Sequence, residues 1–174
     1  MNSKKLIARA TVVIATFTLL SKILGFIREM ALAYVFGATA STDAFLVAHT
    51  IPNIIFAILA GALTLVAVPV FSSYAARDRR DEAWQVFGIF TTVISLLLIV
   101  IILLGLPLSR YLVWLVAPGL EPQTAGLAAE LLVIMLPGVL FFSLANLFYG
   151  LFNANNIFSI PALGPIFTNI VLII

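Results

Sequence analysis

Long apolar runs separated by short polar breaks dominate this chain. Their positions predict helices over residues 8–35, 42–74, 84–108, 125–152 and 158–174. A bilayer core of about 30 Å takes roughly 20 helical residues per crossing, so the complete runs are long enough to span a membrane. They are too long, and alternate too little, to be the strands of a membrane barrel. We therefore predict an all-α integral membrane protein, a polytopic helical bundle of about five transmembrane helices in a single domain over residues 1–174.

Proline and glycine divide the last two apolar runs. Pro137-Gly138 should weaken the fourth helix, and Pro161, Gly164 and Pro165 should interrupt the fifth. Broken helices of this kind surround the substrate in alternating-access transporters. The fifth run ends at Ile174 with no polar flank or aromatic anchor, so we expect the chain to continue in a longer parent protein.

Composition supports a membrane location and narrows the chemistry. The chain is 63% hydrophobic and 9% charged, and its mean hydropathy is +1.22, so lipid must be its main solvent. It has no cysteine and one histidine, which predicts no metal site and no thiol chemistry. No phosphate loop, dinucleotide motif or zinc-protease motif is present in the sequence, and no cofactor is expected. Movement of a substrate fits better than its conversion, so the chain is not expected to be an enzyme.

Charge asymmetry predicts the orientation. If the N-terminus is cytoplasmic, the short outer loops carry Arg110 as their one cation, and the inner side carries Lys4, Lys5, Arg9, Arg77, Arg79 and Arg80. Loops rich in lysine and arginine stay on the cytoplasmic side. Trp84 would then lie at the inner interface of the third span, with Tyr111 and Trp114 at the outer one. Both patterns predict a cytoplasmic N-terminus.

Three charged residues lie inside the first span. Placing Lys22, Arg28 or Glu29 at the bilayer centre costs roughly 2.5–3.5 kcal/mol per charge, so these side chains should face a cavity or one another. Gly25 lies between them on nearly the same side of the helix. Lys22 has no acidic neighbour at its own depth except Glu29, which favours a functional role. For Arg28, a structural ion pair with Glu29 or Asp43 and a transport role are both open.

The second and fourth spans also carry polar side chains. Asp43, His49 and Asn53 lie in the second span, and a hairpin that turns near Ala38 would place His49 level with Arg28. This predicts a polar pocket in the outer half of the membrane. In the fourth span a polar stripe within an arc of about 80° is formed by Ser143, Asn146, Gly150 and Asn153. Such stripes are more often contacts between packed membrane helices than substrate sites.

Several short motifs occur in an order typical of one family. They are Ser21–Glu29, Phe36-Gly37-Ala38, Thr42–Phe45, Ile51-Pro52-Asn53, Val68–Phe71, Gly150–Ala154, Ile160–Pro165 and Asn169-Ile170. The chain thereby resembles the MurJ/MviN lipid II flippases. The resemblance implies a two-lobed transporter of the bacterial inner membrane, of which this chain would form most of the N-terminal lobe. It implies that alternating access carries lipid II, an undecaprenyl-pyrophosphate-linked peptidoglycan precursor, to the outer leaflet for cell-wall synthesis.

The resemblance also implies a substrate site. Arg28 and Asp43 match cavity residues of the family, and Lys22 stands where an arginine is usual. With Asn53 they form the expected substrate-binding set, and Asp43 would orient Arg28 or couple an ion. The candidate cavity-lining residues are Gly25, Glu29, His49, Ser143, Asn146 and Asn153. Phe56 and Ala57 occupy positions where the family usually has a pair of arginines.

Partners implied by the resemblance are membrane lipid, the lipid-linked substrate and cell-wall synthesis proteins. Its energy source would be the membrane potential or a monovalent ion. Three alternatives stay open. The substrate could be another lipid-linked glycan, the parent could be a cation-coupled exporter of drugs, or it could be a membrane scaffold that transports nothing.

Overall fold

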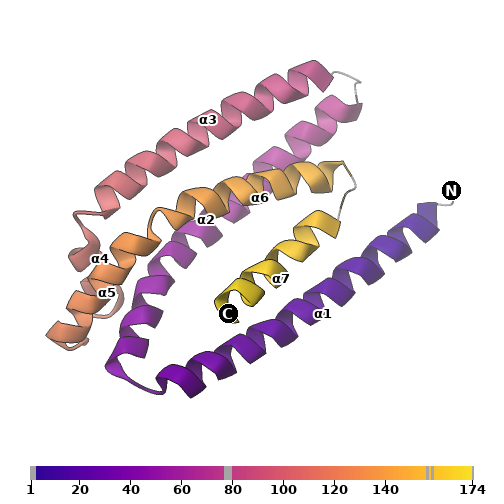
Figure 1. Cartoon of the computed structure of the whole chain (residues 1–174). Helices are drawn as coiled ribbons and strands as arrows, with labels where there is room; N and C mark the ends of the chain where they lie inside the picture. The colour runs from indigo at the N-terminus through magenta and orange to yellow at the C-terminus, as the bar shows by residue number, and fades with distance from the viewer. Residues whose placement is uncertain (1–2, 77–79, 156, 158, 174) are drawn as a thin grey trace. The chain divides into compact units, whose positions relative to one another are not determined.

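The computed structural model describes residues 3–76, 80–155, 157 and 159–173, and the side chains of residues 11–59, 73, 81–153, 155, 157, 159–171 and 173. These residues form helices and contain no strand, which confirms the predicted all-α fold (Figure 1). The helices are α1 (Ser3–Phe36), α2 (Ala40–Ala76), α3 (Arg80–Gly105), α4 (Ser109–Val116), α5 (Pro122–Met135), α6 (Gly138–Ala154) and α7 (Ser159–Ile173).

Three described helices are long and apolar enough to cross a bilayer. They contain the segments Thr11–Phe36, Ala40–Leu59 and Asp81–Gly105. The pair α5 and α6 makes a fourth candidate if it is counted as one span with a bend of 44°. The segment Ser159–Val171 of α7, in the predicted fifth span, is also apolar but shorter. These lengths agree with a helical membrane protein.

The chain divides into two compact units. The first contains α1, Phe152–Ala154 at the end of α6, and α7, which packs beside α1 (Figure 1). The second contains α2 to α5 and α6 as far as Leu151. The prediction of a single domain over residues 1–174 stays a prediction.

Local chemistry explains where α1 ends and α2 begins. Gly37 has a φ of 64°, a left-handed conformation that favours glycine, and its N–H donates to the carbonyl of Ala33 at 3.0 Å. This bond closes the last turn of α1. Thr39 then caps α2, because its Oγ1 accepts from the N–H of Thr42 at 3.4 Å and its carbonyl accepts from Asp43 at 3.0 Å.

Small residues form the centre of the second unit. Ala44 and Ala48 of α2 and Ala128 of α5 are fully buried in one cluster with larger residues of α3, α4 and α5. Alanine at a helix contact lets two backbones approach closely, as is common between membrane helices. Aromatic edges hold α6 to its neighbours: Phe142 meets Phe56 at a centroid distance of 6.2 Å, and Phe148 meets Phe87 at 5.4 Å.

Proline affected the predicted helices unequally. The fourth one is bent at Leu136-Pro137, as expected. The prediction that Pro161, Gly164 and Pro165 interrupt the fifth is wrong, because α7 runs continuously from Ser159 to Ile173. Pro161 lies in the first turn, where its missing N–H would have had no helical acceptor. Pro165 inside the helix removes only the bond to the carbonyl of Pro161.

The helix α4 was not predicted. The expected third helix extended to residue 108, but α3 ends at Gly105, and Leu106–Leu108 form a turn in which Ser109 N–H donates to the carbonyl of Leu106 at 3.4 Å. Pro107 disfavours a continuing helix here, because it cannot donate to the carbonyl of Leu103 and its ring crowds that carbonyl. The eight residues after the turn form α4, whereas the sequence predicts no helix between residues 108 and 125.

Candidate functional site

Asn169 of α7 joins α1 through both ends of its amide. It is 8% exposed, and its Nδ2 donates to the carbonyl oxygen of Ser21 at 3.0 Å and to Ser21 Oγ at 3.3 Å. Its Oδ1 accepts from Arg28 Nη1 at 3.3 Å. A buried amide needs such partners, because leaving it unpaired in an apolar environment is costly. The two helices are therefore held in one register by a polar contact as well as by packing.

Gly25 leaves room for this contact. Ser21, Gly25 and Arg28 are spaced i, i+4 and i+7, so they share one face of α1. A Cβ atom at Gly25 would lie 3.7 Å from Asn169 Nδ2 and 3.8 Å from Oδ1, which is ordinary contact. A larger side chain would compete with the amide for the same space. Gly25, predicted as cavity lining, thus lies against the Asn169 amide.

Arg28 is already engaged on two sides. Its Nη2 pairs with Glu29 Oε1 at 2.5 Å, and its Nη1 bonds to Asn169. The side chain of Arg28 is 24% exposed and that of Glu29 is 58% exposed. Arg28 Nε is buried without a partner among the described residues. Of the two pairings open to Arg28, the structure shows the one with Glu29.

Lys22 lies in a different environment, on the wall of a groove in the first unit. This groove has a volume of about 410 Å³. Its lining residues are Ile14, Thr18, Ser21 and Lys22 of α1, Asn153 of α6, and Pro161, Ala162 and Pro165 of α7. Lys22 is the charged residue among them, and it has no ion-pair partner within the part of the chain that the structure describes.

Spacing along the helices explains how the groove forms. Ile14, Thr18 and Ser21 are spaced i, i+4 and i+7, so they lie on one face of α1 with Lys22 next to them. On α7, Pro161 and Pro165 are one turn apart, and neither can donate a backbone hydrogen bond. The groove therefore combines apolar walls with one ammonium group, two hydroxyl groups and the amide of Asn153. This donor set suits an anionic group attached to an apolar chain.

The candidates on α2 belong to the second unit. Asp43 is exposed in the first turn of α2. Asn53 Nδ2 donates to His49 Nδ1 at 2.9 Å, and the Phe45 ring stacks on His49 at a centroid distance of 5.7 Å. His49 and Asn53 are thus one turn apart on α2 and hydrogen-bonded to each other. A shared pocket of Arg28 and His49 would join the two units, and it stays a prediction.

The candidates on α6 divide in the same way. Asn153 lines the groove with Lys22. Ser143 is 1% exposed, and its Oγ has no hydrogen-bond partner among the described residues. Asn146 is half-buried and does not line the groove. Ser143 is therefore packed inside the second unit, whereas Asn153 lines the groove of the first.

Asn169 and Thr18 were not predicted as site residues, although Asn169 belongs to the family motif Asn169-Ile170. Asn169 is the one amide in the apolar run from Ile166 to Ile174, and a polar residue at membrane depth could have marked it. Thr18 gave no such signal, because a lone threonine in a membrane helix usually bonds its own backbone.

The cations expected on the cytoplasmic side lie outside the described side chains: Lys4, Lys5, Arg9, Arg77, Arg79 and Arg80.

Comparison with known proteins identifies the family. The family model described as "Lipid II flippase MurJ" matches residues 32–174. The lipid II flippase MurJ of Burkholderia cenocepacia is 34% identical over 168 residues, which cover 95% of this chain and 33% of that protein. The probable lipid II flippase MurJ of Synechocystis sp. is 33% identical over 173 residues, 99% of this chain and 32% of that protein.

A third relative has a similar level of identity. The lipid II flippase MurJ of Thermosipho africanus is 31% identical over 162 residues, 92% of this chain and 33% of that protein. The chain spans about a third of the length of these relatives. Its apolar helices make it a multi-pass membrane protein. The match over most of its length places the chain in the MurJ family of lipid II flippases.

Proposed function

We propose that the protein containing this chain is a flippase of the bacterial inner membrane. It carries a lipid-linked peptidoglycan precursor, lipid II, from the inner to the outer leaflet by alternating access, for cell-wall synthesis. The relatives named above are described as lipid II flippases, which supports this substrate. The chain acts as the part of the transporter that presents one cation to the substrate, with the N-terminus on the cytoplasmic side.

The position of Lys22 carries this proposal. A lysine inside a membrane helix is costly unless it faces water or an anion. Lys22 lies on a groove beside the hydroxyl-bearing residues Thr18 and Ser21, with no carboxylate paired to it in the described part of the chain. An ammonium ion with nearby donors can bind a phosphate oxygen. The diphosphate of the lipid carrier would meet Lys22 there, next to the apolar wall of prolines.

Arg28 has a second role in the proposal. Because Glu29 and Asn169 already hold its guanidinium, Arg28 offers the substrate less free charge than Lys22 does. We assign it to the edge of the site, where it fixes α1 against α7 and adds positive potential. Asp43 and Asn53 of α2 are also assigned to substrate binding. Asp43 would couple an ion or orient a cation. Coupling would draw on the membrane potential or a monovalent ion.

Growth rescue tests the role of Lys22. The full-length protein is expressed in cells depleted of their own lipid II flippase, and growth and exposure of the precursor to a membrane-impermeant probe are measured. Lys22→Arg should rescue growth, because the positive charge is kept. Lys22→Ala and Lys22→Glu should fail, with Glu the more severe. Equal expression of all variants in the membrane is required, and is checked by immunoblotting.

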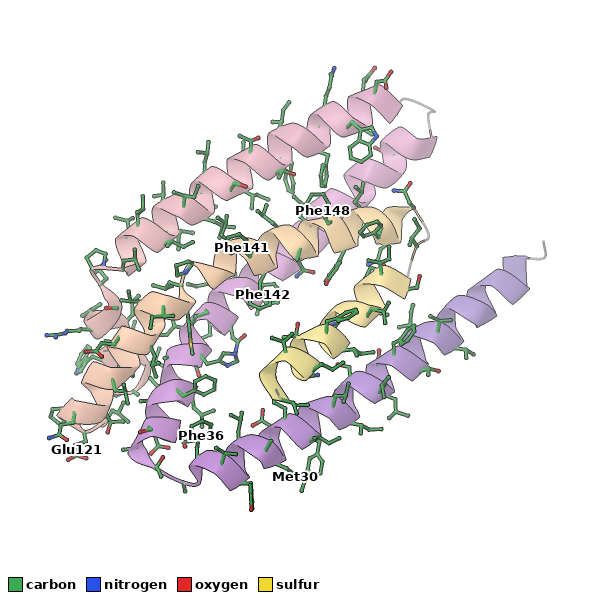
Figure 2. The ribbon with its side chains drawn as sticks, in the orientation of Figure 1. Met30, Phe36, Glu121, Phe141, Phe142 and Phe148 are labelled. Atoms are coloured by element: carbon green, nitrogen blue, oxygen red, sulfur yellow. The ribbon has the colours of Figure 1, made fainter. Side chains whose placement is uncertain are left out.

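A matched control comes from the same helix. Met30 lies on α1 (Figure 2), is 57% exposed and does not line the groove. Met30→Ala removes a flexible side chain of similar length to lysine, and it should rescue growth fully. Normal rescue by Lys22→Ala would overturn the assignment of Lys22. Efflux of a drug by the unsubstituted protein, with no exposure of the precursor, would favour the exporter instead.

A further inference from the structure

The helix α4 has one face buried in the second unit. Ser109 is 7% exposed and Val113 is 1% exposed, and Val113 belongs to the cluster that contains Leu132 and Leu136. Leu112 is half-buried against the same cluster. The helix packs on α5 and α2. These contacts fix the orientation of α4 about its own axis, so its opposite face is fixed too.

The opposite face carries two large aromatic rings beside a cation. Tyr111 and Trp114 are each 57% exposed, and Leu115 is 60% exposed. The rings of Tyr111 and Trp114 stack at a centroid distance of 5.9 Å with an interplanar angle of 29°. With 100° per residue, this exposed face covers an arc of about 140° around the helix. Across the arc the order of residues is Arg110, Trp114, Tyr111 and Leu115. The face therefore changes from charged to aromatic to aliphatic.

The place of α4 along the chain sets its depth in the membrane. The apolar segment Asp81–Gly105 of α3 is 25 residues long, which is enough to cross a bilayer, and α4 begins four residues after it. The turn at Leu106–Leu108 thus lies where a membrane span ends. Arg110 is also the only lysine or arginine between residues 81 and 174. A single cation at the end of a long apolar span is placed to meet a lipid phosphate.

We propose that the exposed face of α4 binds the headgroup layer of the membrane. Tyr111 and Trp114 lie among the headgroups, where an aromatic ring can face the acyl chains while its polar atom stays hydrated. Arg110 contacts the lipid phosphate, and Leu115 reaches toward the acyl chains. The lipid here is bulk phospholipid that anchors the connection between α3 and α5. The proposal does not depend on the transported substrate, so it stands or falls separately from the flippase function.

Depth measurement with nitroxide labels tests this placement. The full-length protein, with no other cysteine, carries one label at position 111, 114 or 115 and is reconstituted in phosphatidylcholine vesicles with phosphatidylglycerol. Collision rates with oxygen and with a polar nickel chelate report depth. Position 97 is the hydrocarbon reference, because Leu97 is 51% exposed on α3, and the exposed Glu121 in the loop before α5 is the aqueous reference.

The expected result is an intermediate depth. Labels at 111 and 114 should be less accessible to nickel than the label at 121, and less accessible to oxygen than the label at 97, with 115 deeper than 114. Accessibility to nickel equal to that at 121 would overturn the proposal, since the face would then be in water. An immobilised spectrum with little access to either reagent would also overturn it, since protein would then cover the face.

A charge change tests the contact of Arg110. With the label at 114, Arg110→Glu should raise the accessibility to nickel about twofold in the anionic vesicles, because attraction to the surface becomes repulsion. Arg110→Lys should leave it unchanged. Equal values for Arg110→Glu and the unsubstituted protein would overturn the contact between Arg110 and phosphate.

Discussion

At the scale of single residues, the contact of Asn169 with α1 shows how one amide can organise a charged site in a membrane protein. Its carbonyl oxygen takes one donor from Arg28, and its amino group is satisfied by Ser21. Arg28 keeps Glu29 as its ionic partner. This arrangement lowers the cost of a guanidinium at membrane depth. It leaves Lys22, the residue next to Ser21, without an ion-pair partner among the described residues.

Replacement of the amide should weaken the first unit. Asn169→Leu keeps the branched shape and the number of side-chain heavy atoms but leaves Arg28 Nη1 without its acceptor. Interhelical hydrogen bonds in membranes are worth about 0.6 kcal/mol on average, and bonds to charged groups about 1.5–3 kcal/mol, so a loss of about 1–2 kcal/mol is expected. The free energy of unfolding of the full-length protein in micelles would measure it.

The neighbouring residue supplies the control. Thr168 Oγ1 donates to the carbonyl of Gly164 in its own helix at 3.2 Å. Thr168→Val keeps the branched shape and removes a hydrogen bond within α7, so it should change stability by less than about 0.5 kcal/mol. A similar loss for both variants would mean that the interhelical bond has no special weight.

At the scale of helices, packing in the second unit depends on small side chains where α2 meets α5. Ala44 and Ala48 are fully buried on α2, one turn apart, and Ala128 is fully buried on α5. Lipid tails are as apolar as leucine, so hydrophobicity alone does not bring two helices together in a membrane. Close approach and van der Waals contact do, and alanine permits them.

Enlarging one of these alanines should therefore be harmful. Ala48→Leu forces extra volume into the α2–α5 contact, and overpacking of this kind costs about 1–3 kcal/mol. Ala57→Leu on the same helix is the matched control, because Ala57 is exposed. Thermal unfolding of the full-length protein in micelles compares them. If Ala48→Leu unfolds no earlier than Ala57→Leu, tight packing at Ala48 is contradicted.

At the scale of the whole molecule, the distribution of charge predicts which side of the membrane each loop faces. The part of the chain from residue 81 onward carries one cation, Arg110, whereas the residues before it carry eight of the nine. Loops with lysine and arginine stay on the cytoplasmic side. Glu121, labelled in Figure 2, precedes α5 and should face the outside.

Cysteine labelling tests this topology, because the chain contains no cysteine of its own. Glu121→Cys and Asp81→Cys are placed singly in a full-length protein without other cysteines. A membrane-impermeant maleimide should label position 121 in intact cells and position 81 only after permeabilisation. Both residues are exposed, so accessibility within the protein is matched. The opposite pattern would reverse the proposed orientation.

Much of the helical organisation could be predicted because it depends on local properties. Apolar length selects helices that can span a membrane, and glycine and threonine at 37 and 39 mark the end of one helix and the start of the next. The two errors also have a local cause. Both concern proline, which a membrane helix can tolerate or end at: α7 continues through Pro165, whereas α3 stops at Gly105, before Pro107.

The sequence by itself determined that this chain is a helical membrane protein with costly charges at Lys22, Arg28 and Glu29, because burial of charge in lipid is unfavourable wherever it occurs. Only the tertiary structure decided which charge stays available. Asn169 lies 141 residues from Arg28 along the chain, so no local pattern could reveal their bond. Where α7 packs on α1, Asn169 binds Arg28, and the groove beside Lys22 is formed. This contact between distant segments therefore gives the two cations different surroundings.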